Sequence, residues 1–327
     1  MICVVTGATG CLGLNLTKRL IKDGHEVIAL GRNQHLGTHL TQLGAQFIVL
    51  DLKEHERLKQ ICQNAETIFH CAALSSPWGK YKDFYEANVI GTQHVIEATP
   101  PAARIIHVSS PSIYFDFTEK HQIEEQDNLP HKAVNNYIKS KRLAESLIDR
   151  AHQEKKLDVI TIRPRAIFGP YDRTILPRLL SAEKNGVLPI IGSGENIIDI
   201  TFVDNVVESL ILAAKADRQY SGRKYNITND EPQTLITIIT TLYQALKKPL
   251  NVKYIPYSAA KKIAHVLEFL YSLPLITREP RLTTYSAGVL ALGQTLNITA
   301  AKQDLGYHPI VTIAEGIQQF ATWHESL

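Results

Sequence analysis

A glycine-rich turn between a short apolar run and an amphipathic stretch constrains the fold of this chain more than any other feature. The β-branched run Ile2–Val5 precedes Thr6-Gly7-Ala8-Thr9-Gly10-Cys11-Leu12-Gly13, and Leu12–Lys22 has helical periodicity. Three glycines at three-residue spacing tighten the turn, admit a pyrophosphate close to the backbone, and let the helix pack on a sheet. Free N–H groups and the helix dipole attract anions there. The pattern predicts dinucleotide contacts from Gly7, Thr9, Gly10, Cys11, Leu12 and Gly13.

Short apolar runs alternate with amphipathic stretches through the first half of the chain. Runs that are apolar on both faces are typical of parallel strands between helices. We expect strands at Ile2–Val5, Glu26–Leu30, Gln46–Leu50, Thr67–His70, Ile105–Ser109 and Val159–Arg163, and helices at Leu12–Lys22, Asp83–Ala98 and Asn136–Gln153. The sequence therefore predicts an α/β fold, with a Rossmann-type doubly wound parallel sheet.

Prolines and glycines interrupt the rhythm after Arg163, which predicts a smaller mixed C-terminal domain that caps the substrate site. Residues 1–165 are expected to form the dinucleotide domain, and 166–196 and 219–327 the cap. The strand-like Ile197–Val203 and the helical Asn205–Ala216 are expected to return to the main sheet, so that 197–218 belongs to the first domain. The apolar stretch 257–271 has three open interpretations, which are core packing, a substrate lid and a peripheral membrane-surface helix.

Composition excludes several classes of protein. The 327 residues carry a net charge of only +3, without the broad basic footprint of a nucleic-acid binder. No apolar run approaches the ~20 residues that span a bilayer. The chain opens on a strand-like run rather than a leader pattern, and the cysteines form no CxxC pair, so we expect reduced thiols and a cytoplasmic setting. His35 and His39 share HxxxH spacing without a third ligand, so no metal site is expected.

The residues that follow the second and third predicted strands bear on the choice of cofactor. An NAD site usually places a carboxylate at the end of the second strand. Here Gly31 and Arg32 occupy that place, and a guanidinium binds the 2′-phosphate of NADP through charge-assisted hydrogen bonds. NADP is therefore favoured, with NAD as the alternative. Asp51 and Leu52 close the third strand, where they are expected to reach the adenine.

The run Tyr137-Ile138-Lys139-Ser140-Lys141 predicts the chemical centre. A tyrosine and a lysine at i and i+4 project from one face of a helix. A free tyrosine has a pKa of ~10, and a neighbouring ammonium and an oxidised nicotinamide would lower it into the range of acid/base catalysis. Ser110 ends the preceding strand, where its hydroxyl is expected to hydrogen-bond the substrate oxygen.

Motifs along nearly the whole chain resemble the extended short-chain dehydrogenases/reductases. They include TGATGCLG, HCAA, NVIGT, SSPSIY, YIKSK, RPRAIFGP, ITFVDN, YNITN and LGYHP. Within that family, HCAALSSPWGKYKDFYEANVIGT and SSPSIYF look most similar to the 3β-hydroxysteroid dehydrogenase-like branch, which includes sterol dehydrogenases and bacterial 3-oxoalkanoate reductases.

The resemblance implies a role for individual residues. Tyr137 matches the acid/base, Lys141 the residue that binds the nicotinamide ribose, and Ser110 the residue that binds the substrate oxygen. Asn88 matches an asparagine for which two roles stay open, contact with a proton-relay water and, in extended members, support of the structure alone. Further cofactor contacts are implied for Cys71, Ala72, Ala73, Pro164 and Ile167. A homodimer is common in the family and is expected here.

These features favour an NADP(H)-dependent oxidoreductase that interconverts a ketone and a secondary alcohol on a small hydrophobic substrate, sterol-like or 3-oxoacyl-like. Substrate contacts are expected from Ser75, Ser76, Trp78, Ser110 and Ser112. A dehydratase is disfavoured, because Pro111 and Ser112 stand where that reaction needs acidic residues. Two alternatives stay open, a nucleotide-sugar 4-epimerase with bound NAD and a non-catalytic NADP-binding redox sensor.

Overall fold

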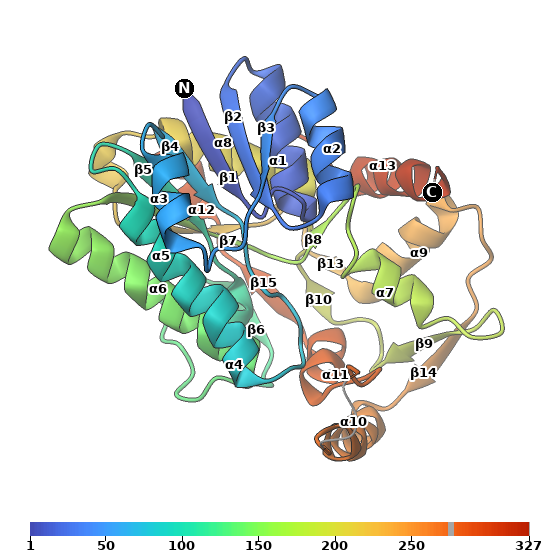
Figure 1. The fold of residues 1–327 in the computed structure, drawn as a ribbon. Helices are drawn as coiled ribbons and strands as arrows, with labels where there is room; N and C mark the ends of the chain where they lie inside the picture. Colours follow the sequence, from blue (N-terminus) through green and yellow to red (C-terminus); the bar gives the residue numbers. More distant parts are fainter. Residues whose placement is uncertain (274–277, 327) are drawn as a thin grey trace.

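The computed structural model describes residues 1–273 and 278–326, so that residues 274–277 of the expected cap and Leu327 lie outside the described part. Its centre is a seven-stranded parallel sheet in the order β12-β7-β5-β4-β1-β2-β3 (Figure 1). The strands are β1 (Ile2–Thr6), β2 (Glu26–Gly31), β3 (Gln46–Val49), β4 (Thr67–His70), β5 (Arg104–Val108), β7 (Asp158–Pro164) and β12 (Lys224–Ile227). The strand order reverses between β1 and β4, where a doubly wound sheet opens a crevice at its carboxyl edge.

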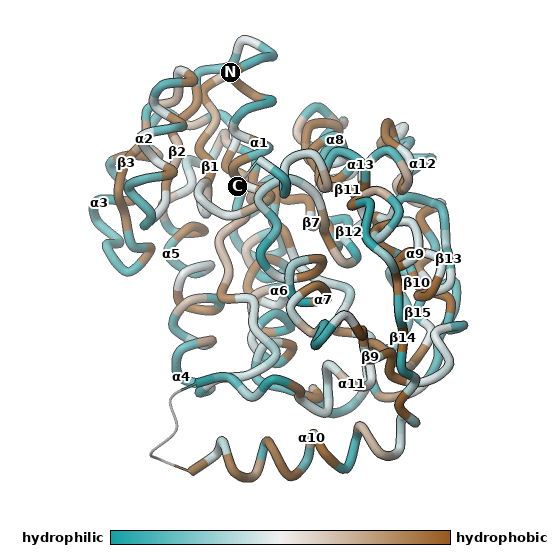
Figure 2. Tube along the Cα trace, turned by 90° about the vertical axis from the view of Figure 1, so that its right-hand side faces the viewer, coloured by the Kyte–Doolittle hydropathy of each residue, from teal (hydrophilic) through white to brown (hydrophobic). Residues whose placement is uncertain are grey.

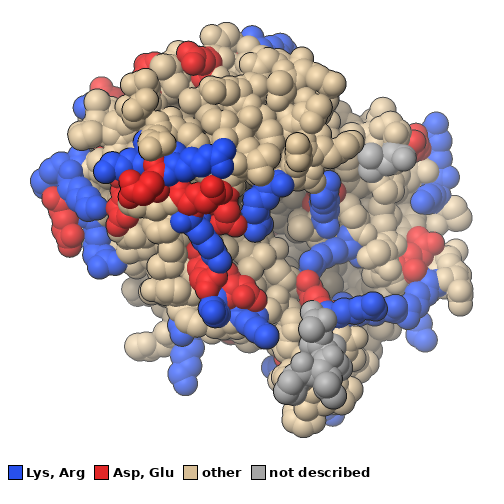
Figure 3. All heavy atoms as spheres, in the orientation of Figure 1, with Lys and Arg blue, Asp and Glu red and all other residues tan. Residues whose placement is uncertain are grey.

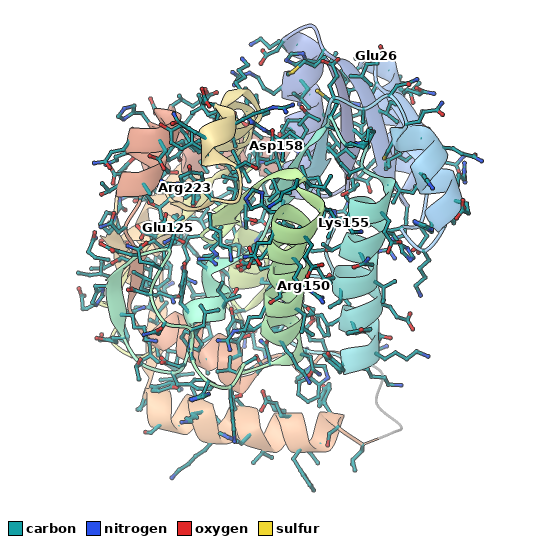
Figure 4. All side chains as sticks on the ribbon, turned by 90° about the vertical axis from the view of Figure 1, so that its left-hand side faces the viewer. Glu26, Glu125, Arg150, Lys155, Asp158 and Arg223 are labelled. Atoms are coloured by element: carbon teal, nitrogen blue, oxygen red, sulfur yellow. The ribbon has the colours of Figure 1, made fainter. Side chains whose placement is uncertain are left out.

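Helices cover both faces of this sheet, as the doubly apolar strands predict. One layer contains α1 (Cys11–Lys22), α2 (Gln34–Gln42) and α8 (Val203–Lys215). The other contains α3 (His55–Cys62), α4 (Tyr81–Phe84), a π-helical turn (Tyr85–Ile90), α5 (Gly91–Ala98) and α6 (Asn136–Lys155). The predicted Rossmann-type fold is confirmed. Figure 4 shows α6, which bears Arg150, beside α5.

The smaller part combines short strands and helices below the carboxyl edge of the sheet (Figure 1). A four-stranded sheet has the order β13-β10-β15-β6, and two further pairs are β11-β8 and β14-β9. The strands are β6 (Lys120–Ile123), β8 (Ile167–Phe168), β9 (Leu188–Ile191), β10 (Ile197–Ile198), β11 (Thr201–Phe202), β13 (Gln233–Thr234), β14 (Val252–Ile255) and β15 (Gln294–Leu296). The helices of this smaller part are α7 (Leu176–Ser181), α9 (Leu235–Ala245), α10 (Tyr257–Tyr271) and α11 (Thr284–Ala291). Two further helices lie higher, with α12 (Thr299–Leu305) packed against β12 and α8 and α13 (Ile313–Glu325) packed against α9.

The structure corrects one predicted strand. The run 197–203 does not return to the main sheet, because β10 joins the small sheet and β11 pairs with β8. The edge strand of the main sheet is instead β12, which pairs with β7 and lies in the segment assigned to the cap. The helix α8, which follows β11, does pack against α1 on the main sheet. The sequence does not predict β12 as a buried strand, because the polar Asn226 interrupts its short apolar run.

The helix α10 buries little of its apolar surface. Ala260 and Ala264 are buried, whereas Ile263, Val266 and Phe269 are 52%, 59% and 70% exposed. The helix lies along the lower edge of the molecule, where apolar residues recur along its length (Figure 2). These large side chains are therefore not part of a hydrophobic core, which excludes for them one of the three interpretations of 257–271. Among residues 1–273 and 278–326, no helix has the length and apolarity needed to cross a membrane.

Candidate active site

The glycine-rich turn has the shape that the sequence predicts. Gly7 has φ +69°, and a Cβ there would lie 2.7 Å from the Cα of Ala72 at the end of β4. A Cβ on Gly13 would lie 2.3 Å from the carbonyl oxygen of Gly7, so the helix packs directly on the turn. Gly10 precedes α1, and no side chain caps the helix. This bare helix start fits the pyrophosphate of a dinucleotide.

Several predicted cofactor contacts surround that turn. Cys71 and Ala72 follow β4 directly, and the Ala72 amide donates to Thr6 Oγ1 at 3.2 Å. Pro164 ends β7 and Ile167 begins β8 at the same edge of the sheet. Cys11 Sγ donates to the Pro170 carbonyl at 3.4 Å, which ties the start of α1 to the chain beyond β8. Thr9 in the turn is half-buried, and Leu12 at the start of α1 is buried. Ala73, which lies beyond Ala72, is exposed.

Arg32 and Asp51 lie side by side at the ends of β2 and β3. The Arg32 Nη1 atom is 4.0 Å from Asp51 Oδ2, and the two side chains are 80% and 44% exposed. A Cβ on Gly31 would lie 2.8 Å from Thr9, so only glycine lets the turn pack on β2 here. The guanidinium is therefore held by one long contact and is free to bind an anion. Leu52 lies next to Asp51, and its carbonyl is 2.7 Å from His94 Nδ1.

The helix α6 presents Tyr137 and Lys141 toward the carboxyl end of β5. Asn135 caps the helix, and its side chain accepts from the Ile138 amide at 2.8 Å. The buried Lys141 Nζ donates to the Val108 carbonyl at 2.7 Å. Ser110 follows β5, and its hydroxyl, like that of Ser75, lies close enough to the Tyr137 phenol to oppose the rise in pKa that burial causes. The structure thus brings Tyr137, Lys141 and Ser110 together.

Burial governs the pKa values of both Tyr137 and Lys141 in the protein without cofactor. Burial raises the pKa of Tyr137, although the hydroxyls of Ser110 and Ser75 oppose that shift. Burial also lowers the pKa of Lys141 to about 8. The ammonium of Lys141 is bound to Val108 and does not by itself produce an acidic phenol. The other cause that the sequence predicts is the positive charge of an oxidised nicotinamide.

The pKa of Lys141 gives a stability test. Its pKa falls from 10.5 to about 8 on folding, so between these values the unfolded chain binds more protons and stability rises with pH. We expect wild type to gain stability relative to Lys141→Met across this range, by at most about 3 kcal/mol. Urea unfolding at several pH values measures the difference. Lys139→Met, which removes an exposed lysine of the same helix, is expected to show no such slope. A flat difference for Lys141→Met would contradict the expectation.

The side chain of Asn88 makes its hydrogen bonds to other residues of the protein. Its side chain accepts from the Leu74 amide at 2.7 Å and donates to the Leu74 carbonyl at 3.1 Å and to Ser140 Oγ at 2.8 Å. Asn88 is buried in the π-helical turn, so its amide joins the segment after β4 to α6. Of the two roles that the sequence leaves open, this geometry favours support of the fold.

The predicted substrate residues line one side of the centre. The Ser110 and Ser112 hydroxyls are hydrogen-bonded to each other, and Ser75 lies beside the Tyr137 phenol. The Ser76 hydroxyl oxygen lies 2.8 Å from the Trp78 carbonyl and 3.2 Å from Glu279 Oε2, either of which accepts its single proton, so Ser76 connects the segment after β4 to the smaller part. The hydroxyl of Ser76 is thus already hydrogen-bonded within the protein, and substrate contacts from Ser76 and Trp78 remain predictions.

Two residues near this centre, Tyr285 and Arg165, have no role predicted from the sequence. Tyr285 of α11 lies close to Ser112, to Arg165 and to Tyr137. Arg165 follows β7 and is 6% exposed. Arg165 lies within the RPRAIFGP motif without an assigned role, and no pattern in the sequence marks Tyr285. The face in Figure 3 is hollowed between the two parts of the molecule, and Lys and Arg side chains stand around the opening.

The sheet order, the bare helix start and the Tyr-Lys-Ser cluster together define an NAD(P)-dependent oxidoreductase that acts on CH–OH groups. The model of the NAD dependent epimerase/dehydratase family matches residues 3–228. A 2-alkyl-3-oxoalkanoate reductase of Shewanella oneidensis is 31% identical over 96% of this chain and 84% of that protein. A sterol-4-alpha-carboxylate 3-dehydrogenase (decarboxylating) of Mus musculus is 32% identical over 97% and 89%.

A solved structure shares the fold. The UDP-glucuronic acid 4-epimerase of Bacillus cereus in complex with NAD has a TM-score of 0.79 at 21% identity, covering 100% of this chain and 99% of that chain. The chain belongs to the NAD dependent epimerase/dehydratase family, as an extended short-chain dehydrogenase/reductase of the 3β-hydroxysteroid dehydrogenase-like branch. The family resemblance that the sequence motifs indicate is confirmed.

Proposed function

We propose that this protein is an NADP(H)-dependent oxidoreductase that interconverts a ketone and a secondary alcohol on a hydrophobic substrate, sterol-like or 3-oxoacyl-like. The observation that carries the proposal is the meeting of Tyr137, Ser110 and Lys141 at the carboxyl edge of the sheet, next to the glycine-rich turn. The names of two relatives support the substrate class, one a 3-oxoalkanoate reductase and the other a sterol-4-alpha-carboxylate dehydrogenase.

Tyr137, Ser110 and Lys141 have different roles in the proposed hydride transfer. The glycine-rich turn and the start of α1 would hold the dinucleotide, which would supply the hydride in reduction and accept it in oxidation. Tyr137 donates its phenolic proton to the carbonyl oxygen as that oxygen gains charge, and it takes the proton back from the hydroxyl in the reverse direction. Ser110 donates a hydrogen bond to the same oxygen and orients it. Lys141 is held by Val108 on the face of α6 that bears the phenol, where it would bind the nicotinamide ribose.

Turnover with a panel of substrates tests this function. We expect loss of NADPH absorbance at 340 nm with long-chain ketones or 3-oxo acids, and formation of NADPH from NADP⁺ with the matching alcohols. Conversion of a UDP-sugar to its epimer without net change in NADPH would favour the epimerase. Binding of NADPH without turnover of any compound in the panel would favour the redox sensor. Either outcome would overturn the proposal.

The preference for NADP is tested at Arg32. We expect Arg32→Ala to weaken NADPH binding by ~1.5–3 kcal/mol, because charged hydrogen bonds to the 2′-phosphate are lost, and to leave NADH binding nearly unchanged. Fluorescence titration of both cofactors measures the two affinities. The matched control is Arg57→Ala, which removes an exposed arginine of α3 that pairs with Glu54. Equal weakening of NADPH and NADH would remove the claim of NADP preference.

A further inference from the structure

Arg165 carries a buried guanidinium to which the described residues offer no hydrogen bond or ion pair. It follows β7 directly and is only 6% exposed. Within residues 1–273 and 278–326, no carboxylate oxygen lies within 4.0 Å of it, and its Nε atom is buried without a hydrogen bond. Arg163, two residues earlier in the chain, is by contrast paired with Glu145. Burying an unpaired charge is costly, so a positively charged group in this state is expected to have an anionic partner that binds it.

The backbone fixes Arg165 in place. Its amide donates to the Ile227 carbonyl of β12 at 3.0 Å, and the next carbonyl, that of Ala166, accepts from the Thr201 amide at 3.2 Å. Ala166 has φ +42°, a conformation that costs free energy for a residue with a side chain. The strand end is therefore held by its neighbours, and the guanidinium remains near the carboxyl edge of the sheet.

The neighbours of Arg165 connect it to the catalytic centre. Burial lowers the pKa of Arg165, while the charges of Tyr285 and Asp199 oppose the shift. Tyr285 in turn lies beside Ser112 and Tyr137, so one phenol is a common neighbour of the guanidinium and of the reacting centre. Asp199 does not neutralise the arginine by contact. Its Oδ2 atom accepts from the Leu296 amide at 2.8 Å, and burial raises its pKa to about 6.

We propose that Arg165 binds a carboxylate of the substrate, so that the reacting carbon stands close to an acid group, as in a 3-oxo or 3-hydroxy carboxylic acid. This inference rests on the proposed function. A planar guanidinium binds a carboxylate through two parallel hydrogen bonds, which fixes the orientation of the ligand as well as its charge. The carbonyl oxygen then meets Ser110 and Tyr137, while the carboxylate meets Arg165 beside Tyr285. Arg165 is thereby a residue that determines specificity for acids over neutral ketones and esters.

Matched acid and ester substrates test this role in the full chain. We expect wild type to oxidise 3-hydroxydecanoate with NADP⁺ at a kcat/KM roughly 10–150 times that for methyl 3-hydroxydecanoate, the ratio that corresponds to one charged hydrogen-bonded pair. In Arg165→Met the two values are expected to come within about threefold, because only the rate with the acid falls. The dissociation constant for NADP⁺ is expected to stay the same. Loss of NADP⁺ binding, or an equal fall with acid and ester, would overturn the proposal.

Two further measurements separate this inference from the proposed function. Decanoate lacks the reacting hydroxyl, so its binding, measured by calorimetry in the presence of NADP⁺, does not depend on turnover. We expect decanoate to bind wild type and not Arg165→Met, and methyl decanoate to bind both alike. If wild type turns over neutral alcohols but binds acids no better than esters, the inference fails while the function stands. If decanoate binds through Arg165 but no alcohol is oxidised, the function fails while the carboxylate site stands.

Thermal unfolding distinguishes a ligand-binding arginine from a structural one. Removal of an unpaired buried charge does not break an ion pair, so ligand-free Arg165→Met is expected to melt at or above the temperature of wild type. Arg163→Met, which leaves Glu145 without its main partner, is the contrasting variant and is expected to melt at a lower temperature. A large fall in melting temperature for Arg165→Met would show that the side chain supports the fold, and would overturn the proposal.

Discussion

Replacement of Tyr137 by phenylalanine is expected to lower kcat by a factor of ~10²–10⁴, the range that a positioned general acid/base contributes. The variant keeps the ring that packs in the cluster with Ile113, Ile138 and Tyr285, and it loses only the hydroxyl that carries the proton. The affinity for NADPH is expected to stay nearly unchanged, because the glycine-rich turn and α1 lie on other elements. Stopped-flow turnover and fluorescence titration of NADPH measure the two effects separately.

The control for this prediction is another phenol on a neighbouring helix. Tyr81→Phe removes the hydroxyl of a tyrosine of α4 whose ring contacts the Lys139 ammonium, with Nζ 4.2 Å from the ring centroid. We expect its turnover to remain within about threefold of wild type, since phenylalanine keeps the ring that contacts Lys139 and the lost hydroxyl takes no part in the proposed proton transfer. If Tyr137→Phe kept a turnover similar to that of Tyr81→Phe, the assignment of the acid/base residue would be wrong.

The main sheet could be predicted from the sequence because its strands are buried on both faces. The predicted runs at β1, β2, β3, β4, β5 and β7 match the observed strands to within one or two residues at each end. The smaller part could not be predicted in the same way. Its strands β8, β10, β11 and β13 are two residues long, too short to show any period, and their pairing depends on contacts between segments far apart in the chain, such as Ile198 with Gln294.

The site could be predicted where a motif fixes local geometry, and not where the tertiary structure does. The spacing of Tyr137 and Lys141 places them on one helical face in any α-helix, and the glycine turn constrains its own backbone. Asn88 lies in a π-helical turn, and its three hydrogen bonds to Leu74 and Ser140 follow only from the packed structure. Arg165 and Tyr285 are 120 residues apart in the sequence, and no local pattern indicates that the charge of one acts on the other.

The orientation of α6 depends on a buried ion pair one turn beyond the catalytic lysine. Arg163 of β7 donates from Nε to Glu145 Oε1 at 3.0 Å and from Nη2 to Oε2 at 2.6 Å. The two residues are 3% and 4% exposed. Arg163 also donates to the Tyr114 hydroxyl and, at 3.1 Å, to the Glu125 carbonyl. The pair therefore connects the helix that bears Tyr137 and Lys141 to the sheet and to the chain after β5.

Glu145→Ala is expected to lower the free energy of unfolding by about 3–5 kcal/mol, because it leaves Arg163 buried without its main partner. The double variant Glu145→Leu with Arg163→Met removes both charges and is expected to recover most of that loss, since apolar side chains of similar size can replace a buried pair. Urea unfolding of the single and double variants measures the coupling between the residues. A double variant no more stable than Glu145→Ala would mean that packing or the hydrogen bonds to Tyr114 and Glu125, rather than the ion pair, hold α6 against the sheet.

Kinetics of the double variant separate the effect on protein stability from the effect on the position of Tyr137. The KM for substrate is expected to rise if the loss of this fixed contact lets the phenol of Tyr137 move.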